Sequence, residues 1–248
     1  MDIRQAVDFE SFNGILTISD IHNEYYTAKK AIDIALERNL LIVFLGDLLD
    51  GGPWPTETLL LVKQILDEKL GILIIGNHDD KLYRYAIGNE VKLASAQVET
   101  LQDASDHELF LGTLRDVHTH PLATYYAYAD QAMFVHGAAD PSLWQHPDEV
   151  NRKQKGMCLY GEVDGTRDET GWPKRTYAWC EEVPAGHLVF VGHDRSAKGK
   201  PLTDIGQYTN AKGGTTYFTD CSCGKKPDFG PVGIAIIVDG TVELLKVK

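Results

Sequence analysis

The sequence lacks the features that mark a membrane or secreted protein. Its longest apolar runs, such as 40–45 and 233–238, are far shorter than the roughly 18 residues that a bilayer-spanning helix needs. The first residues, MDIRQAVDFESF, contain no apolar stretch of the kind found in secretory signals. Only four cysteines occur, and no two of them form a CxxC pair. These absences predict a cytoplasmic protein with reduced thiols and argue against a thiolate zinc site.

Basic residues are also scarce. The 24 lysines and arginines are outnumbered by 36 carboxylates, which gives a formal net charge of −12. Proteins that coat duplex nucleic acid neutralise its phosphates with lysine and arginine, so that mode of binding is not expected. A composition of 43% hydrophobic and 24% charged residues is typical of a globular protein. No linker rich in proline, glycine and serine divides the chain, so we expect a single domain over residues 1–248.

The pattern of apolar residues indicates an α/β fold. Continuous apolar runs at 14–19, 40–45 and 71–75 predict buried strands, and helical spacing predicts helices over 27–38 and 55–69. Strands that are apolar on both faces belong to a sheet covered on both sides. Residues 80–125 are expected to be mainly helical, and 150–179 to form a long loop. Further strands are expected at 125–128, 132–135, 187–191, 215–219, 233–238 and 242–247.

Polar side chains follow five of these strands at the point where each strand ends. They form the segments Asp20-Ile21-His22, Gly46-Asp47-Leu48-Leu49-Asp50, Gly76-Asn77-His78-Asp79, His136-Gly137 and Gly192-His193. The carboxyl ends of strands in a helix-flanked sheet are where ligand sites form. Carboxylate and amide oxygens with imidazole nitrogens suit divalent metals, and one carboxylate can bridge two ions. We therefore predict a dinuclear metal site.

In this order, these segments resemble the signature of the calcineurin-like metallophosphoesterases over most of the chain. The sequence is most similar to the phosphoprotein-phosphatase branch, which includes phage and bacterial Ser/Thr phosphatases and the phosphatase module of bacterial polynucleotide kinase-phosphatases. The loop Gly161-Glu162-Val163-Asp164-Gly165 and the pair Asp220-Cys221 are similar to that last group. The resemblance implies a four-layer α/β (α+β) fold: a central β-sandwich of mixed sheets flanked by helices, with the metals at strand carboxyl ends.

The resemblance also implies which residues hold two divalent ions. Asp20 and His22 would bind one metal, Asn77, His136 and His193 the other, and Asp47 would bridge both. Mn²⁺ is the metal that the resemblance suggests. The ligand types also allow Fe, Zn²⁺, Ni²⁺ or Co²⁺.

A general acid next to the metals is implied as well. His78 would protonate the leaving oxygen, with Asp50 or Asp79 orienting its imidazole. Asn77 would also contact the substrate. Asp220 would hydrogen-bond to a ligand histidine or to a water and so orient it. Alternatively, it would only cap an ordinary turn.

The sequence departs from the related phosphatases at the residue after Asp50. An arginine that clamps the phosphate usually stands there, and this chain has Gly51. Arg175 and Arg195 are the candidates to replace it, although Arg195 could instead pair with Asp194 or Asp204.

Two groups in the later part of the chain bear on the choice of substrate. Aromatic side chains between residues 160 and 179 could stack a base but more often pin a loop to the core. Lysines near the C-terminus could hold a second phosphate. The aromatic residues are Tyr160, Trp172, Tyr177 and Trp179. The lysines are Lys198, Lys200, Lys225 and Lys226.

The expected function is that of a dinuclear-metal-dependent phosphomonoesterase. Its substrate would be a phosphoprotein, a nucleotide or a nucleic-acid 3′ end. The alternative on the same site is a phosphodiesterase or a dinucleoside-polyphosphate hydrolase, and a binding module without activity is a third reading. No membrane partner is expected, and the sequence leaves the oligomeric state open.

Overall fold

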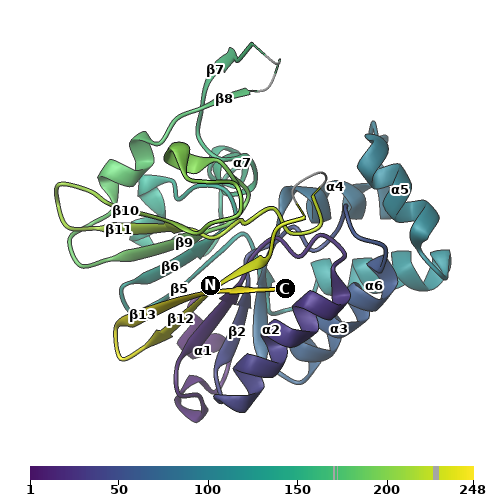
Figure 1. Ribbon diagram of the computed structural model, residues 1–248, viewed down its shortest axis with the longest axis horizontal. Coiled ribbons are helices and arrows are strands. Elements are labelled where there is room, and N and C mark those ends of the chain that lie inside the picture. Colours follow the sequence, from purple (N-terminus) through teal and green to yellow (C-terminus); the bar gives the residue numbers. More distant parts are fainter. Residues whose placement is uncertain (170, 172, 226–228) are drawn as a thin grey trace.

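Two β-sheets pack face to face at the centre of the computed structural model, which describes residues 1–169, 171, 173–225 and 229–248 (Figure 1). The six-stranded sheet has the order β13 (Thr241–Val247), β12 (Val232–Val238), β1 (Ile15–Ile18), β2 (Leu41–Phe44), β3 (Gly71–Ile74) and β4 (Ala123–Thr124). The five-stranded sheet has the order β10 (Gly206–Thr209), β11 (Thr215–Phe218), β9 (Leu188–Val191), β6 (Ala132–Val135) and β5 (Tyr126–Ala129).

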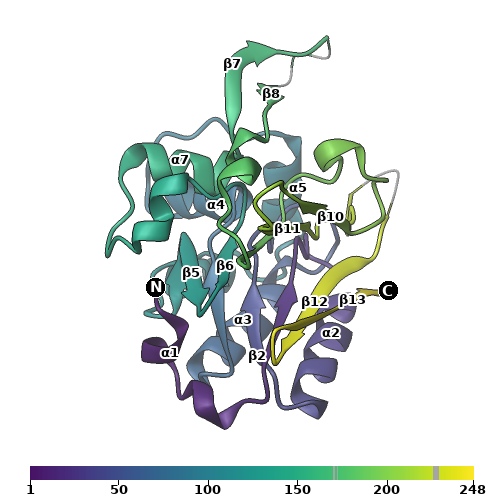
Figure 2. The same ribbon diagram turned by 90° about the vertical axis from the view of Figure 1, so that its left-hand side faces the viewer.

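Helices cover the outer faces of both sheets. On the six-stranded sheet these are mainly α2 (Tyr25–Glu37), α3 (Pro55–Asp67) and α6 (His107–His118), and α4 (Asn77–Ala86) packs on α6 (Figures 1 and 2). The short α1 (Ile3–Ala6) contacts β5, α5 (Ser95–Asp103) lies at the periphery, and α7 (Arg152–Tyr160) lies beside the five-stranded sheet. The expected α/β fold with helix-flanked mixed sheets is confirmed.

The direction of the strands explains where polar residues gather. Strands β1 to β4 run parallel, and β6, β9 and β11 run parallel in the second sheet. Every residue of β1, β2 and β3 is buried, as the continuous apolar runs predict. Because parallel strands end on the same side, their carboxyl-terminal loops converge at one edge of each sheet.

The five-stranded sheet is apolar on both faces. Phe190 stacks on Phe134 and Tyr217, with ring centroids 5.5 and 4.9 Å apart, between the two sheets. The alternate residues Val189 and Val191 belong to a second core with Trp179 on the outer face. Two apolar faces give the four-layer arrangement that the resemblance implies.

The prediction of a long loop over 150–179 is wrong. Helix α7 occupies part of it, because the Asn151 side chain accepts hydrogen bonds from the backbone N–H of Lys153 and Gln154, and Gln154 Oε1 accepts one from Asn151 N. A hairpin of β7 (Val163–Arg167) and β8 (Pro173–Arg175) follows and projects away from the sheets (Figure 2). Trp172 and Lys226 lie outside the described residues. Strands β4 and β10 have no counterpart among the expected elements.

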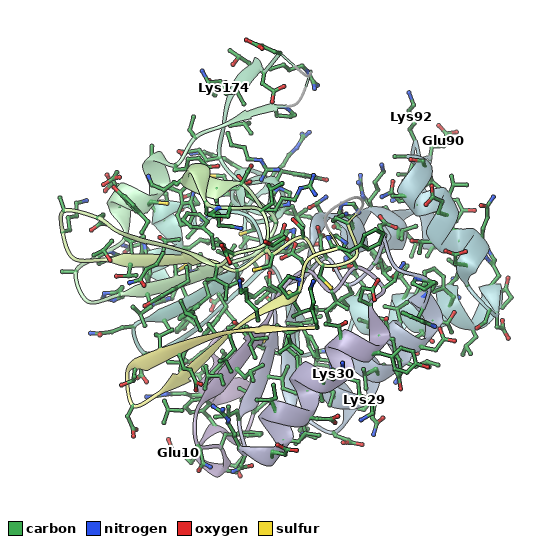
Figure 3. All side chains as sticks on the ribbon, viewed as in Figure 1. Glu10, Lys29, Lys30, Glu90, Lys92 and Lys174 are labelled. Carbon is green, nitrogen blue, oxygen red and sulfur yellow. The ribbon has the colours of Figure 1, made fainter. Side chains whose placement is uncertain are left out.

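Charged side chains point outward at the periphery, as Glu10, Lys29, Lys30, Glu90, Lys92 and Lys174 do in Figure 3. Among the described helices, none combines the length and the apolar character that crossing a membrane requires.

Candidate metal centre and active site

The loops that follow β1, β2, β3, β6 and β9 bring the predicted polar residues together. Asp20, Asp47 and His193 adopt left-handed backbone conformations, with φ of 46°, 49° and 64°. Such values are uncommon for residues other than glycine and cluster at functional sites. The neighbouring glycines allow the loops to approach closely: a Cβ on Gly76 would lie 2.1 Å from Asp47 N, and one on Gly192 would lie 2.1 Å from Asp20 Oδ2.

Two groups of metal-ligating side chains share one carboxylate. In one group, ligand atoms of Asp20, His22 and Asp47 lie within 4.8 Å of one another, and in the other the same holds for Asp47, His136 and His193. Asp47 is 3% exposed and belongs to both groups. A shared carboxylate between two sets of ligands is the arrangement that bridges a pair of cations. No cysteine belongs to either group in the described part of the chain.

Backbone carbonyls orient two of the imidazoles. His22 Nδ1 donates to the carbonyl of Leu49 at 2.7 Å, and His136 Nδ1 donates to the carbonyl of Leu45 at 2.7 Å. This leaves both Nε2 atoms directed at Asp47, at 3.9 Å from Oδ2 for His22 and 3.3 Å from Oδ1 for His136. A histidine that donates one ring nitrogen to a carbonyl presents the other as a ligand.

The third imidazole has an unsatisfied nitrogen. His193 Nε2 is buried and has no hydrogen-bond partner among the residues that the structure describes. Its ring packs edge-on against that of His136, with centroids 4.9 Å apart. Burial lowers the pKa of His193 and of His22 well below the ordinary value, so both rings are neutral. Neutral imidazole is the form that binds metals, and a buried orphan nitrogen fits a divalent cation.

Asn77 and Asp47 both approach Nε2 of His136. The amide Oδ1 of Asn77, the first residue of α4, is 3.1 Å from His136 Nε2. Burial alone would raise the pKa of Asp47, but the nearby His136 and His78 hold it well below its usual range. Burial would lower the pKa of His136, but the Asp47 carboxylate raises it to about 9. The six predicted ligands, two of which are carboxylates, thus come together at these loops, with Asn77 and His193 half-buried and the other four buried.

His78 lies next to these ligands and is held by Asp50. Its Nδ1 is 2.5 Å from Asp50 Oδ2, and its Nε2 is 3.8 Å from Asp47 Oδ2. The backbone N–H of His78 donates to Asp47 Oδ1 at 3.0 Å, so the helix start and the shared carboxylate are joined. The side chain is 22% exposed, whereas Asp50 is fully buried. Asp50 thus engages Nδ1, and Nε2 is the ring nitrogen that faces Asp47.

The other two predicted carboxylates bond to backbone. Asp79 accepts from Leu48 N at 3.0 Å and from Gly76 N at 3.3 Å, so of the two proposed partners the structure places Asp50 against His78. Burial, with Asp47 nearby, raises the pKa of Asp79 to about 7. Asp220 accepts from Ser222 N at 2.9 Å, which closes a turn. Burial raises the pKa of Asp20 well above the ordinary value, and the Asp220 carboxylate contributes to this shift.

Two of the candidate basic residues lie near the ligand groups. Arg175 contributes, after burial and His136, to lowering the pKa of His193, and its Nη1 is 3.6 Å from Asp194 Oδ2. Lys225 acts in the same way on His22, and its Nζ is 3.5 Å from the Asp50 carbonyl oxygen.

The remaining basic candidates face other groups. Lys200 donates to three carbonyls within 2.8 Å, and the ammonium of Lys198 lies 3.7 Å from the centroid of the Tyr208 ring. Arg195 is half-buried, and Asp204, one of its proposed partners, pairs with Lys246. Tyr177 and Trp179 pack against Phe218, whereas Tyr160 is 45% exposed.

Two buried residues of this region have no counterpart in the motifs. Gln97 on α5 bonds to Asp50, and Asp80 on α4 is 3% exposed inside a cluster of donors. The Asp80 carboxylate lies 3.1 Å from Arg84 Nε, 3.0 Å from Lys155 Nζ, 3.2 Å from Tyr125 OH and 3.7 Å from His118 Nε2. It therefore ties the helix that carries Asn77 and His78 to α6 and α7. Only the tertiary structure could reveal either contact.

Replacing Asp80 with asparagine is expected to lower the free energy of unfolding by about 1–3 kcal/mol at pH 7. Burial would raise the pKa of Asp80, but bonds from His118 and Lys155 bring it well below the ordinary value. A carboxylate with a depressed pKa stabilises the fold above its unfolded-state pKa of about 4 and loses that contribution at lower pH. Urea unfolding at pH 7 and pH 3 should show the difference between wild type and variant narrowing at acid pH. A difference that stays constant would contradict this role.

Residues 14–205 match the family model described as calcineurin-like phosphoesterase, so this chain belongs to that family. It is 29% identical over 161 residues to the bis(5′-nucleosyl)-tetraphosphatase PrpE [asymmetrical] of Oceanobacillus iheyensis, which covers 62% of each chain. The chain thus spans less than two thirds of that relative. It is 28% identical over 193 residues to the protein of the same name from Bacillus subtilis, covering 71% of this chain and 77% of the relative.

The fold also matches that of solved structures. A protein serine/threonine phosphatase from Saccharomyces cerevisiae superposes with a TM-score of 0.63 at 14% identity, covering 99% of this chain and 85% of the other. Identity at that level shows a shared fold.

Proposed function

We propose that this chain is a metal-dependent phosphomonoesterase. The observation that carries the proposal is the His78–Asp50 pair beside the shared Asp47, at 2.5 Å from Asp50 and 3.8 Å from Asp47. A monoester of an alcohol releases an alkoxide, which needs a proton as it departs. A proton donor held next to a two-metal centre supplies this need.

The ligand set fits two divalent cations. Asp20 and His22 would hold one, Asn77, His136 and His193 the other, and Asp47 both. When bound, such a pair neutralises phosphate oxygens and lowers the pKa of the attacking water. Mn²⁺ is our first expectation for both positions, although the same oxygen and nitrogen ligands suit other first-row metals.

The chain's own residues then position the substrate and move the proton. The half-buried Asn77 is open to the phosphate, and Arg175 and Lys225 place positive charge beside the two ligand groups. His78 holds a proton at Nε2 and gives it to the leaving oxygen, while the Asp50 carboxylate keeps the proton on Nδ1 and stabilises the charged ring. Water attacks the phosphorus directly, with no covalent link to the protein.

Two further expectations belong to this proposal. We expect the chain to work as one domain, because the ligand loops come from both sheets. We expect it in the cytoplasm, because Cys158, Cys180, Cys221 and Cys223 are buried thiols without disulfides, as in reducing compartments.

The second candidate function is hydrolysis of a dinucleoside polyphosphate. Its support is the activity after which the relatives from O. iheyensis and B. subtilis are named, together with a basic residue whose charge acts on each ligand group. Cleavage within a polyphosphate releases a phosphate anion, which departs with less help from an acid than an alkoxide does. The His78–Asp50 pair therefore favours the monoester.

A substrate comparison with manganese-loaded protein separates the two. The panel contains p-nitrophenyl phosphate, its bis-ester, a phosphopeptide, mononucleotides, a 3′-phosphorylated oligonucleotide and diadenosine tetraphosphate. We expect kcat/KM for the best monoester to exceed that for the bis-ester and the tetraphosphate by about tenfold or more, because a general acid typically contributes about 10²–10⁴-fold and helps an alkoxide most. Faster turnover of the tetraphosphate would select the second candidate.

Replacing Lys225 with alanine is expected to lower kcat/KM for p-nitrophenyl phosphate by about 10- to 100-fold, mainly through KM, because a charge-assisted contact contributes about 1.5–3 kcal/mol. Lys198→Ala is the matched control, since its ammonium lies over the Tyr208 ring at 3.7 Å from the centroid. Steady-state kinetics of both variants test the assignment. Equal effects of the two substitutions would show that Lys225 contributes only general surface charge.

A further inference from the structure

Helix α5 buries two side chains, and both are polar. They are Gln97 and Thr100, at 3% and 1% exposure. A surface helix usually buries an apolar stripe, and residues three apart share one face. Thr100 Oγ1 accepts from Asn23 Nδ2 at 3.2 Å, and Asn23 directly follows the ligand His22. The inner face of α5 therefore contacts the loops of the site, although α5 itself lies at the edge of the molecule (Figure 1).

The surroundings of Gln97 fix the orientation of its amide. Oε1 accepts from Lys81 Nζ at 3.1 Å and from Ala94 N at 3.0 Å. Two donors on that side require the oxygen there, so the Nε2 group must face the other way. On that other side Gln97 Nε2 donates to Asp50 Oδ2 and lies 3.3 Å from His78 Nδ1.

The Asp50 carboxylate receives two donors on a single oxygen. Oδ2 accepts from His78 Nδ1 at 2.5 Å and from Gln97 Nε2, whereas Oδ1 has no hydrogen-bond partner within the described part of the chain. Without Gln97, only His78 would hydrogen-bond to this buried carboxylate. The Asp50 carboxylate could then rotate about its Cβ–Cγ bond. A buried acceptor is fixed by the donors around it.

We propose that Gln97 is a positioning residue that fixes the Asp50 carboxylate and thereby holds the His78 ring in the orientation for proton donation. The inference rests on the proposed acid role of His78. Lys81 strengthens the arrangement because it lies three residues after His78 on α4 and bonds to the opposite end of the same amide. Helix α5 thus joins the acid and its carboxylate through one side chain.

Substitution of Gln97 with methionine removes the amide while keeping the volume. Gln154→Met is the matched control, because Gln154 is 6% exposed, occupies the same third position of its helix, and accepts from Asn151 N at 2.8 Å. Gln154 bonds to Ser142 Oγ rather than to Asp50. Both variants lose a capping contact, and only one loses the bond to the carboxylate.

The kinetic test compares leaving groups. Phenyl phosphate releases a phenoxide with a pKa of about 10, like tyrosine, and depends on the acid more than p-nitrophenyl phosphate does. Gln97→Met should lower kcat about tenfold or more for phenyl phosphate and less than about threefold for p-nitrophenyl phosphate, with KM little changed. Gln154→Met should change neither. In a His78→Ala background, Gln97→Met should add no further loss, because residues that act as a unit are not additive.

A second readout does not depend on turnover. A proton in a short histidine–carboxylate hydrogen bond gives a far-downfield NMR signal, which His78→Ala assigns by its disappearance. We expect the signal to move upfield or vanish in Gln97→Met and to stay in Gln154→Met.

These measurements test the positioning role of Gln97 and the acid role of His78 separately. Equal slowing of both substrates by Gln97→Met, or an unchanged proton signal, would overturn the positioning role. If His78→Ala itself showed no dependence on the leaving group, the acid role would fail. The NMR signal would still report whether Gln97 holds the Asp50–His78 pair.

Discussion

Asp47→Asn should reduce the bound metal from two ions per chain to fewer than one and lower kcat by about three orders of magnitude or more, because both ligand groups contain this side chain. Asparagine keeps the volume and an oxygen that can accept from His78 N, so the helix start is preserved. It loses the negative charge and the second oxygen, which a bridge between two cations needs. Elemental analysis after gel filtration measures the metal, and p-nitrophenyl phosphate measures the rate.

The matched control for this variant is Asp79→Asn. Asp79 has the same 3% exposure as Asp47 and lies beside it, but its oxygens accept from Leu48 N and Gly76 N. Asp79→Asn should retain two ions per chain, even if its unfolding free energy falls. Retention of two ions by Asp47→Asn would remove the bridging assignment, and loss of ions in both variants would indicate general damage to the loop.

The sequence could predict that these polar side chains lie together, because the fold places strand ends together. Asp20, Asp47, Asn77, His136 and His193 each follow a buried apolar run, and such runs in a helix-flanked sheet end at a common edge. The residue types then indicate the chemistry. The local pattern therefore predicts a cluster suited to divalent metals, whereas the assignment of each residue to one ion or the other comes from the family resemblance.

The supporting residues are not encoded locally. Asp79 is adjacent to His78 in sequence, yet at the third position of α4 its side chain turns back to the backbone, and Asp50, 28 residues away, reaches the imidazole. Gln97 depends on how α5 docks on α4, which no periodic pattern of apolar residues specifies. Helix α7 was missed for a related reason, since its start depends on the Asn151–Gln154 capping contacts more than on an apolar face.

His78→Ala should lower kcat for phenyl phosphate by about two to three orders of magnitude while leaving two ions bound, because general acids typically contribute about 10²–10⁴-fold. The side chain bonds to Asp50 and only approaches Asp47, at 3.8 Å, and the backbone N–H that holds Asp47 Oδ1 is kept in the variant. The metal content of His78→Ala should therefore stay unchanged while its rate falls, in contrast to Asp47→Asn, where both fall. The kcat of Asp50→Asn for phenyl phosphate should lie between those of wild type and His78→Ala. The amide oxygen still accepts from Nδ1 but stabilises the charged ring less than a carboxylate does. Unaltered turnover in His78→Ala would assign proton donation to water and leave His78 as a structural contact of the Asp47 loop.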